Sequence, residues 1–113
     1  MEKFTYYHPI TVRYADLDPQ NHVNNAVYLT YVESARLGYY QQTGIWEPES
    51  DRLTGMVVAR NEIDYLASVN LGQAIRVGVR LVRIGNSSLT LAFQIERPSD
   101  GAVIARGQSV MVA

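Results

Sequence analysis

A short stretch near the start of the chain, residues 14–26, gathers many side chains that could take part in catalysis. It contains two aspartates, one proline, three asparagines and one histidine, and an apolar stretch typical of a long helix follows it. The first N–H groups of a helix lack partners within it, so a helix start stabilises anions and developing oxyanions. A carboxylate held beside such a helix start could attack a carbonyl group that the helix polarises, or activate water against it.

The elements that must position this stretch are expected in the order strand, long helix, four strands. Residues 5–14 mix aromatic and β-branched side chains, which predicts the first strand, and Pro9 suggests that only the part after it is regular. Apolar residues recur at spacings of three and four through residues 24–43, which predicts the helix. Asn24 or Asn25 could cap the start of this helix, and Gly44 is typical of the position at which a helix ends.

After a polar loop at residues 46–55, alternating apolar and polar side chains predict four further strands. These strands are expected at residues 56–67, 74–84, 88–97 and 102–113. Turn sequences should join the last three as antiparallel neighbours. The helix is apolar on most of its sides, so we expect other structure to enclose it. One enclosed helix on a mostly antiparallel sheet of five strands is an α+β arrangement.

Composition and charge exclude several classes of protein. A chain of 113 residues, 47% of them hydrophobic, predicts one globular domain over residues 1–113. A net charge of −1 gives no basic surface for nucleic acid. The absence of cysteine excludes disulfides and thiol nucleophiles, and two histidines far apart argue against a zinc site. No apolar run reaches the roughly 20 residues of a membrane span, and the first residues of the sequence do not read as the apolar core of a signal peptide, so we expect a cytoplasmic protein without a membrane partner.

The stretch from residue 14 to residue 36 resembles the signature of a known family. The matching positions are Tyr14, Asp16, Asp18, His22, Val23, Asn24, Asn25, Tyr28, Tyr31, Glu33, Ala35 and Arg36. In this order and spacing they are similar to the motif of the 4-hydroxybenzoyl-CoA thioesterase family, which belongs to the hotdog-fold acyl-CoA thioesterases. The family often has glycine before the histidine, where this chain has Asn21. Asparagine tolerates positive φ better than other non-glycine residues, so we expect the same turn.

The resemblance implies a hotdog fold, in which a five-stranded, mostly antiparallel sheet wraps around one long central helix. It also implies an acyl-CoA thioesterase that hydrolyses a thioester to free coenzyme A and a carboxylic acid without a metal or redox cofactor. Coenzyme A would enter as part of the substrate, and an acyl carrier protein could replace it. Relatives with this fold form dimers or tetramers whose active sites lie between subunits. We further expect the natural protein to continue past the apolar residues 110–113, which would otherwise form an exposed edge strand.

By the same resemblance, Asp18 is the catalytic carboxylate, either as a nucleophile that forms an acyl-enzyme anhydride or as a general base for water. The alternative is a turn aspartate that caps a nearby N–H group. A backbone N–H near Asn25 would polarise the thioester carbonyl. His22 would orient the loop or contact the substrate. Glu33 is a second candidate base, and its alternative role is an ion pair with Arg36 one helical turn away.

Substrate binding is expected from Tyr14, Asn24 and Tyr28, and packing in the core or at a dimer interface is the alternative for the tyrosines of the helix. Asp16 is expected to be a structural acceptor for the amides of the loop. Arginines on the predicted strands could bind the phosphates of coenzyme A or face solvent. They are Arg60, Arg76, Arg80, Arg83 and Arg106.

Two other functions stay open at this point. A hydratase or dehydratase of acyl thioesters would keep the fold and use a histidine with an acidic residue, which His22 and Glu33 could supply. The His-Phe-Pro pattern typical of the dehydratases is absent from the sequence. A non-catalytic acyl-CoA-binding module would also keep the fold, because a fold alone does not decide function.

Overall fold

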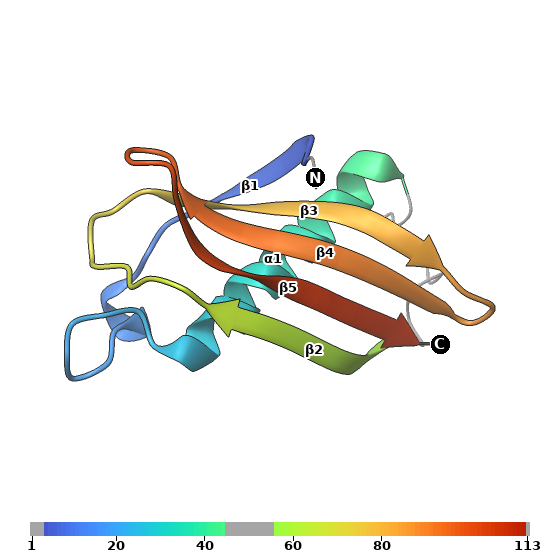
Figure 1. The fold of residues 1–113 in the computed structure, drawn as a ribbon, viewed down its shortest axis with the longest axis horizontal. Helices are drawn as coiled ribbons and strands as arrows, with labels where there is room; N and C mark the ends of the chain where they lie inside the picture. The colour runs from blue at the N-terminus through green and yellow to red at the C-terminus, as the bar shows by residue number, and fades with distance from the viewer. Residues whose placement is uncertain (1–3, 45–55, 113) are drawn as a thin grey trace.

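One five-stranded sheet lies against one long helix in the computed structural model, which describes residues 4–44 and 56–112 (Figure 1). The strands are β1 (Tyr6–Ile10), β2 (Val57–Tyr65), β3 (Ile75–Ile84), β4 (Ser88–Arg97) and β5 (Ala102–Val112). The helix α1 spans Asn25–Thr43, and a short 3₁₀ helix, η1, spans Tyr14–Asp16. All strand pairs are antiparallel, which confirms the predicted α+β arrangement. The loop predicted at residues 46–55 lies outside the described residues.

Local sequence signals explain where most of these elements begin and end. The side-chain oxygen of Asn24 accepts the N–H of Ala26 at 2.9 Å, so Asn24 is the N-cap of α1. Gly44 ends the helix with a φ of 77°, a conformation that glycine adopts without strain. The last four strands agree with their predicted ranges to within two residues. The first strand ends at Ile10 and includes Pro9, so the expectation that only the part after Pro9 is regular was wrong. β1 is an edge strand, where proline is tolerated because its missing N–H can face away from the sheet.

The strand order β1-β3-β4-β5-β2 places β1 and β2 at the two edges of the sheet (Figure 1). α1 runs diagonally behind the sheet and packs mainly against β1 and β3. This leaves β2 poorly covered, and only Ile63 along its length is half-buried. The outer side of α1 is also open, since Leu37 is 45% exposed. The enclosed helix predicted from its apolar sides is therefore not found within the described part of a single chain.

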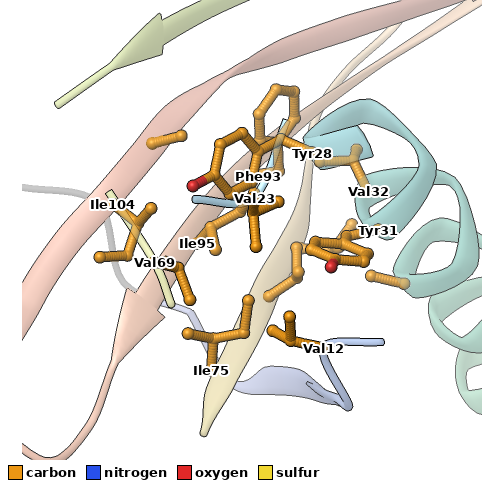
Figure 2. Packing of buried hydrophobic residues seen from close by; sticks show 14 of the residues in the cluster. Val12, Val23, Tyr28, Tyr31, Val32, Val69, Ile75, Phe93, Ile95 and Ile104 are labelled. Carbon is orange, nitrogen blue, oxygen red and sulfur yellow. The ribbon is translucent and has the colours of Figure 1, made fainter. Parts of the chain in front are cut away.

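The helix and the sheet share one hydrophobic core, shown in Figure 2. Tyr28 from α1 and Phe93 from β4 are both almost fully buried in it. Residues outside the regular elements also join this core, among them Val23 from the loop before α1 and Val69 from the segment between β2 and β3. Burying a valine side chain contributes roughly 1.5 kcal/mol or more, so the core itself holds these two loops in place. No helix among the described residues has both the length and the apolar character needed to cross a membrane.

Candidate active site

Asp16 anchors the entry to the loop that precedes α1. Its carboxylate is 1% exposed and accepts hydrogen bonds from the backbone N–H of Arg13 at 2.9 Å, from the Arg13 guanidinium at 2.8 Å and from the Tyr31 hydroxyl at 2.7 Å. Burial raises the pKa of Asp16, but the hydrogen bonds from Arg13 and Tyr31 outweigh it and hold the pKa below its usual range. The Asp16 carbonyl also accepts the N–H of Asn24 at 2.9 Å. Asp16 is thus a structural acceptor that connects the start of the loop, at Arg13, with α1 and with the residue that caps this helix.

Asp18 opens a tight turn that ends at His22. The Asp18 N–H donates to the carbonyl of His22 at 2.8 Å, and the N–H of Asn21 donates to the carbonyl of Asp18 at 3.0 Å. Asn21 has a φ of 63°, which confirms the turn expected where the family often has glycine. One carboxylate oxygen of Asp18, Oδ1, accepts the N–H groups of Gln20 at 2.9 Å and His22 at 3.2 Å. The other oxygen accepts no hydrogen bond from the described residues, so it is available to water or a substrate.

The Asp18–His22 turn is hydrogen-bonded to the segment between β2 and β3. Leu17 and Val23 form an antiparallel bridge that closes the turn into a small hairpin. The N–H of Val23 donates to the carbonyl of Val69 at 2.9 Å, and His22 forms an antiparallel bridge with Asn70. The residues predicted to be catalytic on this loop therefore lie on backbone that is paired on two sides. Such a loop can hold a carboxylate in a constant position.

The start of α1 presents one unused donor. The Ala26 N–H is occupied by the Asn24 side chain, whereas the Asn25 N–H donates to no acceptor among the described residues. Asn25 is exposed, and its carbonyl accepts the hydroxyl of Tyr65 from the end of β2 at 3.1 Å. An N–H without an acceptor at a helix start is suited to bind a carbonyl oxygen that gains negative charge.

Arg97 is hydrogen-bonded to the segment between β2 and β3, which contacts the Asp18–His22 turn. Its guanidinium donates to the carbonyl of Ser68 at 3.0 Å and to the side-chain oxygen of Gln73 at 3.2 Å, and it pairs with Asp100 at 2.9 Å. The hydrogen bond to Asp100 raises the pKa of Arg97. Gln73 also accepts the N–H of Asn70 at 3.0 Å, so this brace by Arg97 and Gln73 reaches the residue that pairs with His22.

The predicted substrate-binding tyrosines lie in very different surroundings. Tyr28 is 1% exposed, and its ring packs edge-on against Tyr31 at 6.1 Å and beside Tyr65 at 5.8 Å between ring centres. Burial raises the pKa of Tyr28. Tyr14 is 81% exposed. The burial of Tyr28 favours a packing role, and substrate contact by either residue stays a prediction.

Glu33 lies apart from the other predicted catalytic residues. It follows Asn25 by eight positions on α1, which is about 12 Å along the helix axis. Glu33 is exposed, so its carboxylate needs no protein partner, and the expected ion pair with Arg36 is not among those of the described residues. A single chain therefore brings Asp18, His22, Asn24 and Asn25 together, and leaves Glu33 to one side.

Sequence reasoning missed the residues that support this site from the sheet. Tyr65, Val69, Asn70 and Arg97 lie 40 or more positions after Asn25, and no local pattern marked them. Among residues 4–44 and 56–112, no group of three or more histidine, aspartate or glutamate side chains is arranged to hold a metal ion.

Comparison with known proteins agrees with this architecture. A crystal structure of a thioesterase from Thermus thermophilus, complexed with coenzyme A and Zn, is 41% identical and superposes with a TM-score of 0.84 over 97% of this chain and 84% of that one. The uncharacterised protein YsmA of Bacillus subtilis is 30% identical over 109 residues, which are 96% of this chain and 72% of YsmA. A 1,4-dihydroxy-2-naphthoyl-CoA thioesterase from Synechocystis is only 16% identical and shows the fold alone, with a TM-score of 0.84 over 95% of this chain and 80% of that one.

The family match covers nearly the whole chain. The model of the thioesterase-like superfamily matches residues 12–113, which include the Asp18–His22 turn, α1 and the last four strands. The match supports a thioesterase role and leaves the substrate unspecified. The chain therefore belongs to the thioesterase-like superfamily and has the hotdog fold of its structural neighbours.

Proposed function

We propose that this protein is an acyl-CoA thioesterase, related in its site to the 4-hydroxybenzoyl-CoA thioesterase family. One observation carries the proposal: a braced turn presents the free oxygen of Asp18 on the same short loop that leads to the unused Asn25 N–H. The family match and the 41% identical thioesterase crystallised with coenzyme A support it. Coenzyme A belongs to the substrate in this proposal, and an acyl carrier protein could present the same thioester.

The chemistry follows from these two groups. The Asn25 N–H would bind the thioester oxygen as it becomes an oxyanion, a contact that typically contributes on the order of 3 kcal/mol. Asp18 would either attack the carbonyl carbon or remove a proton from the water that attacks it. In both routes the carbon–sulfur bond breaks and coenzyme A leaves as a thiolate that takes up a proton. Direct attack leaves an anhydride on Asp18, which water then hydrolyses to the carboxylic acid.

His22 and Asn24 would have supporting roles. The His22 carbonyl accepts the Asp18 N–H, and the His22 N–H donates to the Asp18 carboxylate, so the main contribution of His22 would be the shape of the turn. Asn24 would hold the helix start, because its side chain occupies the Ala26 N–H and leaves the Asn25 N–H free. Glu33 would reach the site only from another chain, because about 12 Å of helix separates it from Asn25.

We propose that the active unit is a dimer. β2 is an edge strand with large exposed apolar side chains, including Val57 at 59% and Tyr65 at 41% exposure. An exposed edge strand offers unpaired N–H and C=O groups to another strand. Tyr65 binds the carbonyl of Asn25, so a partner on this edge would lie next to the helix start. Sedimentation equilibrium measures the oligomeric state, and a monomer with full activity would contradict this part.

The decisive experiment measures release of free thiol from short, medium, long and aryl acyl-CoAs. We expect Asp18→Asn to lower kcat by about a hundredfold or more, since it removes the nucleophile or base. Glu96→Gln is the matched control, because it removes one negative charge from β4 without touching the turn. Circular dichroism of each variant checks that the fold is retained.

Other outcomes would redirect the proposal. Loss of turnover in Glu33→Gln, with Asp18→Asn unaffected, would move the catalytic carboxylate to α1. Appearance or loss of enoyl-thioester absorbance without thiol release would indicate a hydratase or dehydratase. Tight acyl-CoA binding without turnover, unchanged in Asp18→Asn, would indicate a binding module.

A further inference from the structure

A pocket lies on the flank of α1, away from the Asp18 turn. It has a volume of about 290 Å³ and is lined by Glu33, Ser34, Arg36, Leu37 and Tyr40. Arg36 follows Asn25 by eleven positions, which places it about 16 Å along the helix from the proposed oxyanion donor. The pocket therefore belongs to the same helix as the site but not to the reacting centre.

Two buried polar groups in this pocket have no partner among the described residues. Arg36 is only 7% exposed, and its guanidinium makes no hydrogen bond or ion pair with any of them. Tyr40 is 6% exposed, and its buried hydroxyl also has no hydrogen-bond partner there. By contrast, the side chains of Arg76 and Arg97 are more exposed than Arg36, yet both pair with carboxylates, at 2.7 and 2.9 Å.

A charged guanidinium on a mostly buried residue is energetically unfavourable while it has no acceptor among the described residues. The Arg36 nitrogens are not among the fully buried atoms, so they keep some contact with solvent and can meet an anion. The planar set of guanidinium donors matches a carboxylate or phosphate group with two parallel hydrogen bonds. The Tyr40 hydroxyl would add a third donor. Burial raises the pKa of Tyr40 and the nearby Arg36 charge lowers it, with burial dominant, so the hydroxyl stays protonated at neutral pH. Among the described residues, Glu33 is the one acidic group that lines the pocket, and it is exposed and forms no ion pair with Arg36.

We propose that Arg36 and Tyr40 bind an oxyanion of the substrate, either a carboxylate at the far end of the acyl group or a phosphate of coenzyme A. This inference rests on the proposed thioesterase function, because it supposes that the thioester carbonyl binds at the start of α1 while the acyl chain or the coenzyme A moiety extends along the same helix. An extended arm attached at the Asn25 N–H could run along α1 to the pocket. The volume of about 290 Å³ is ample for such a terminal group.

Direct binding tests the pocket without turnover. Isothermal titration of the folded protein with inorganic phosphate and with glutarate should show binding by at least one of these probes. We expect Arg36→Gln and Tyr40→Phe each to weaken it, and the loss of one charged hydrogen bond at Arg36 corresponds to about tenfold or more in Kd. Arg36→Lys should restore part of the affinity. Tyr39→Phe, which removes a hydroxyl from the same helix outside the pocket, is the matched control.

Kinetics then identify the source of the oxyanion. If the pocket binds an acyl carboxylate, the KM of adipoyl-CoA will be lower than that of hexanoyl-CoA, and Arg36→Gln will remove the difference. If it binds a phosphate, Arg36→Gln will raise the KM of hexanoyl-CoA and leave that of hexanoyl-pantetheine unchanged.

Three results would overturn the inference. The first is that both probes bind equally well to the parent and to folded Arg36→Gln. The second is that neither probe binds and the KM values of Arg36→Gln equal those of the parent. The third is that Arg36→Gln changes only the oligomeric state, which would make Arg36 a contact between copies of the chain. If Arg36→Gln does not fold, Tyr40→Phe and Arg36→Lys decide the question in the same assays. If no acyl-CoA is hydrolysed, the proposed function fails, and the titrations still decide whether the pocket binds an oxyanion.

Discussion

Replacing Tyr31 by phenylalanine removes one hydroxyl from the contact between α1 and the loop before it. This hydroxyl donates to the buried carboxylate of Asp16 at 2.7 Å. The ring of Tyr31 is part of the core and remains in the variant, so packing changes little. Asp16 keeps its hydrogen bonds from Arg13 but loses a donor that water cannot easily replace at 1% exposure.

The expected loss of stability follows from the charge of the acceptor. A hydrogen bond to a charged group contributes about 1.5–3 kcal/mol, so we expect Tyr31→Phe to lower the free energy of unfolding by about 2 kcal/mol at pH 7. For a domain of this size that corresponds to a decrease in Tm of roughly 8 °C. Tyr39→Phe is the matched control on the same helix, because its hydroxyl accepts only the neutral Leu81 N–H at 3.1 Å. Tyr39→Phe should lower the free energy of unfolding by about 1 kcal/mol.

The pH dependence gives an independent check. The pKa of Asp16 is lowered in the folded protein, so its contribution to stability is present above its unfolded pKa of about 3.9 and is lost as the pH falls through the folded value. The difference between Tyr31→Phe and the parent should therefore shrink as the pH falls below about 4, whereas that of Tyr39→Phe should not. Urea unfolding at pH 7 and pH 3 measures both. Equal losses in the two variants, or a Tyr31 effect independent of pH, would refute the reasoning.

Three further predictions concern the backbone and the brace. Gly107→Ala should destabilise the protein by about 3 kcal/mol in urea unfolding, because the new Cβ would collide with the backbone carbonyl of Glu62 on β2; a change below about 0.5 kcal/mol would contradict this. Asn21→Ala should cost about 1 kcal/mol, since alanine tolerates a φ of 63° poorly, and Asn21→Gly should stay close to the parent; equal stabilities of the two variants would show that the turn relaxes. Arg97→Gln should lower kcat by about tenfold or more with little change in KM, through displacement of the turn that it braces. Arg76→Gln is the control and should leave kcat unaltered, because Arg76 pairs with Glu96 on the sheet. Equal kcat values in the two variants would show that Arg97 does not position the turn.

Much of the fold was predictable because its signals are local. The helix begins after Asn24 and ends before Gly44, as expected. Asn24 accepts a free N–H at the helix start, and Gly44 adopts the left-handed conformation that ends the helix. The positive φ at Asn21 was expected for a similar reason, since it depends on the conformational freedom of one residue. The last four strands were visible in the alternation of side chains, which reflects the two faces of a sheet.

The parts that sequence reasoning missed depend on segments far apart in the chain. Glu33 was expected to act as a second base or to pair with Arg36 on an enclosed helix, but it is exposed, because the described part of a single chain leaves that side of α1 open. Tyr65 reaches the carbonyl of Asn25 across 40 positions, and the pairing of His22 with Asn70 spans a similar distance. No spacing within the sequence marks such contacts, because they exist only after β2 has paired with β5 at the edge of the sheet.

The sequence by itself determined the element boundaries, the turn at Asn21 and the loop on which the candidate catalytic groups lie. Each of these depends on interactions between residues a few positions apart, which the chain carries wherever it folds. Only the tertiary structure decided which polar groups would be satisfied and which left free. Within the described residues, the fold brought the Tyr31 hydroxyl to Asp16, left Arg36 without an acceptor and left the Asn25 N–H without one, because satisfaction of a polar group depends on what the whole fold packs around it.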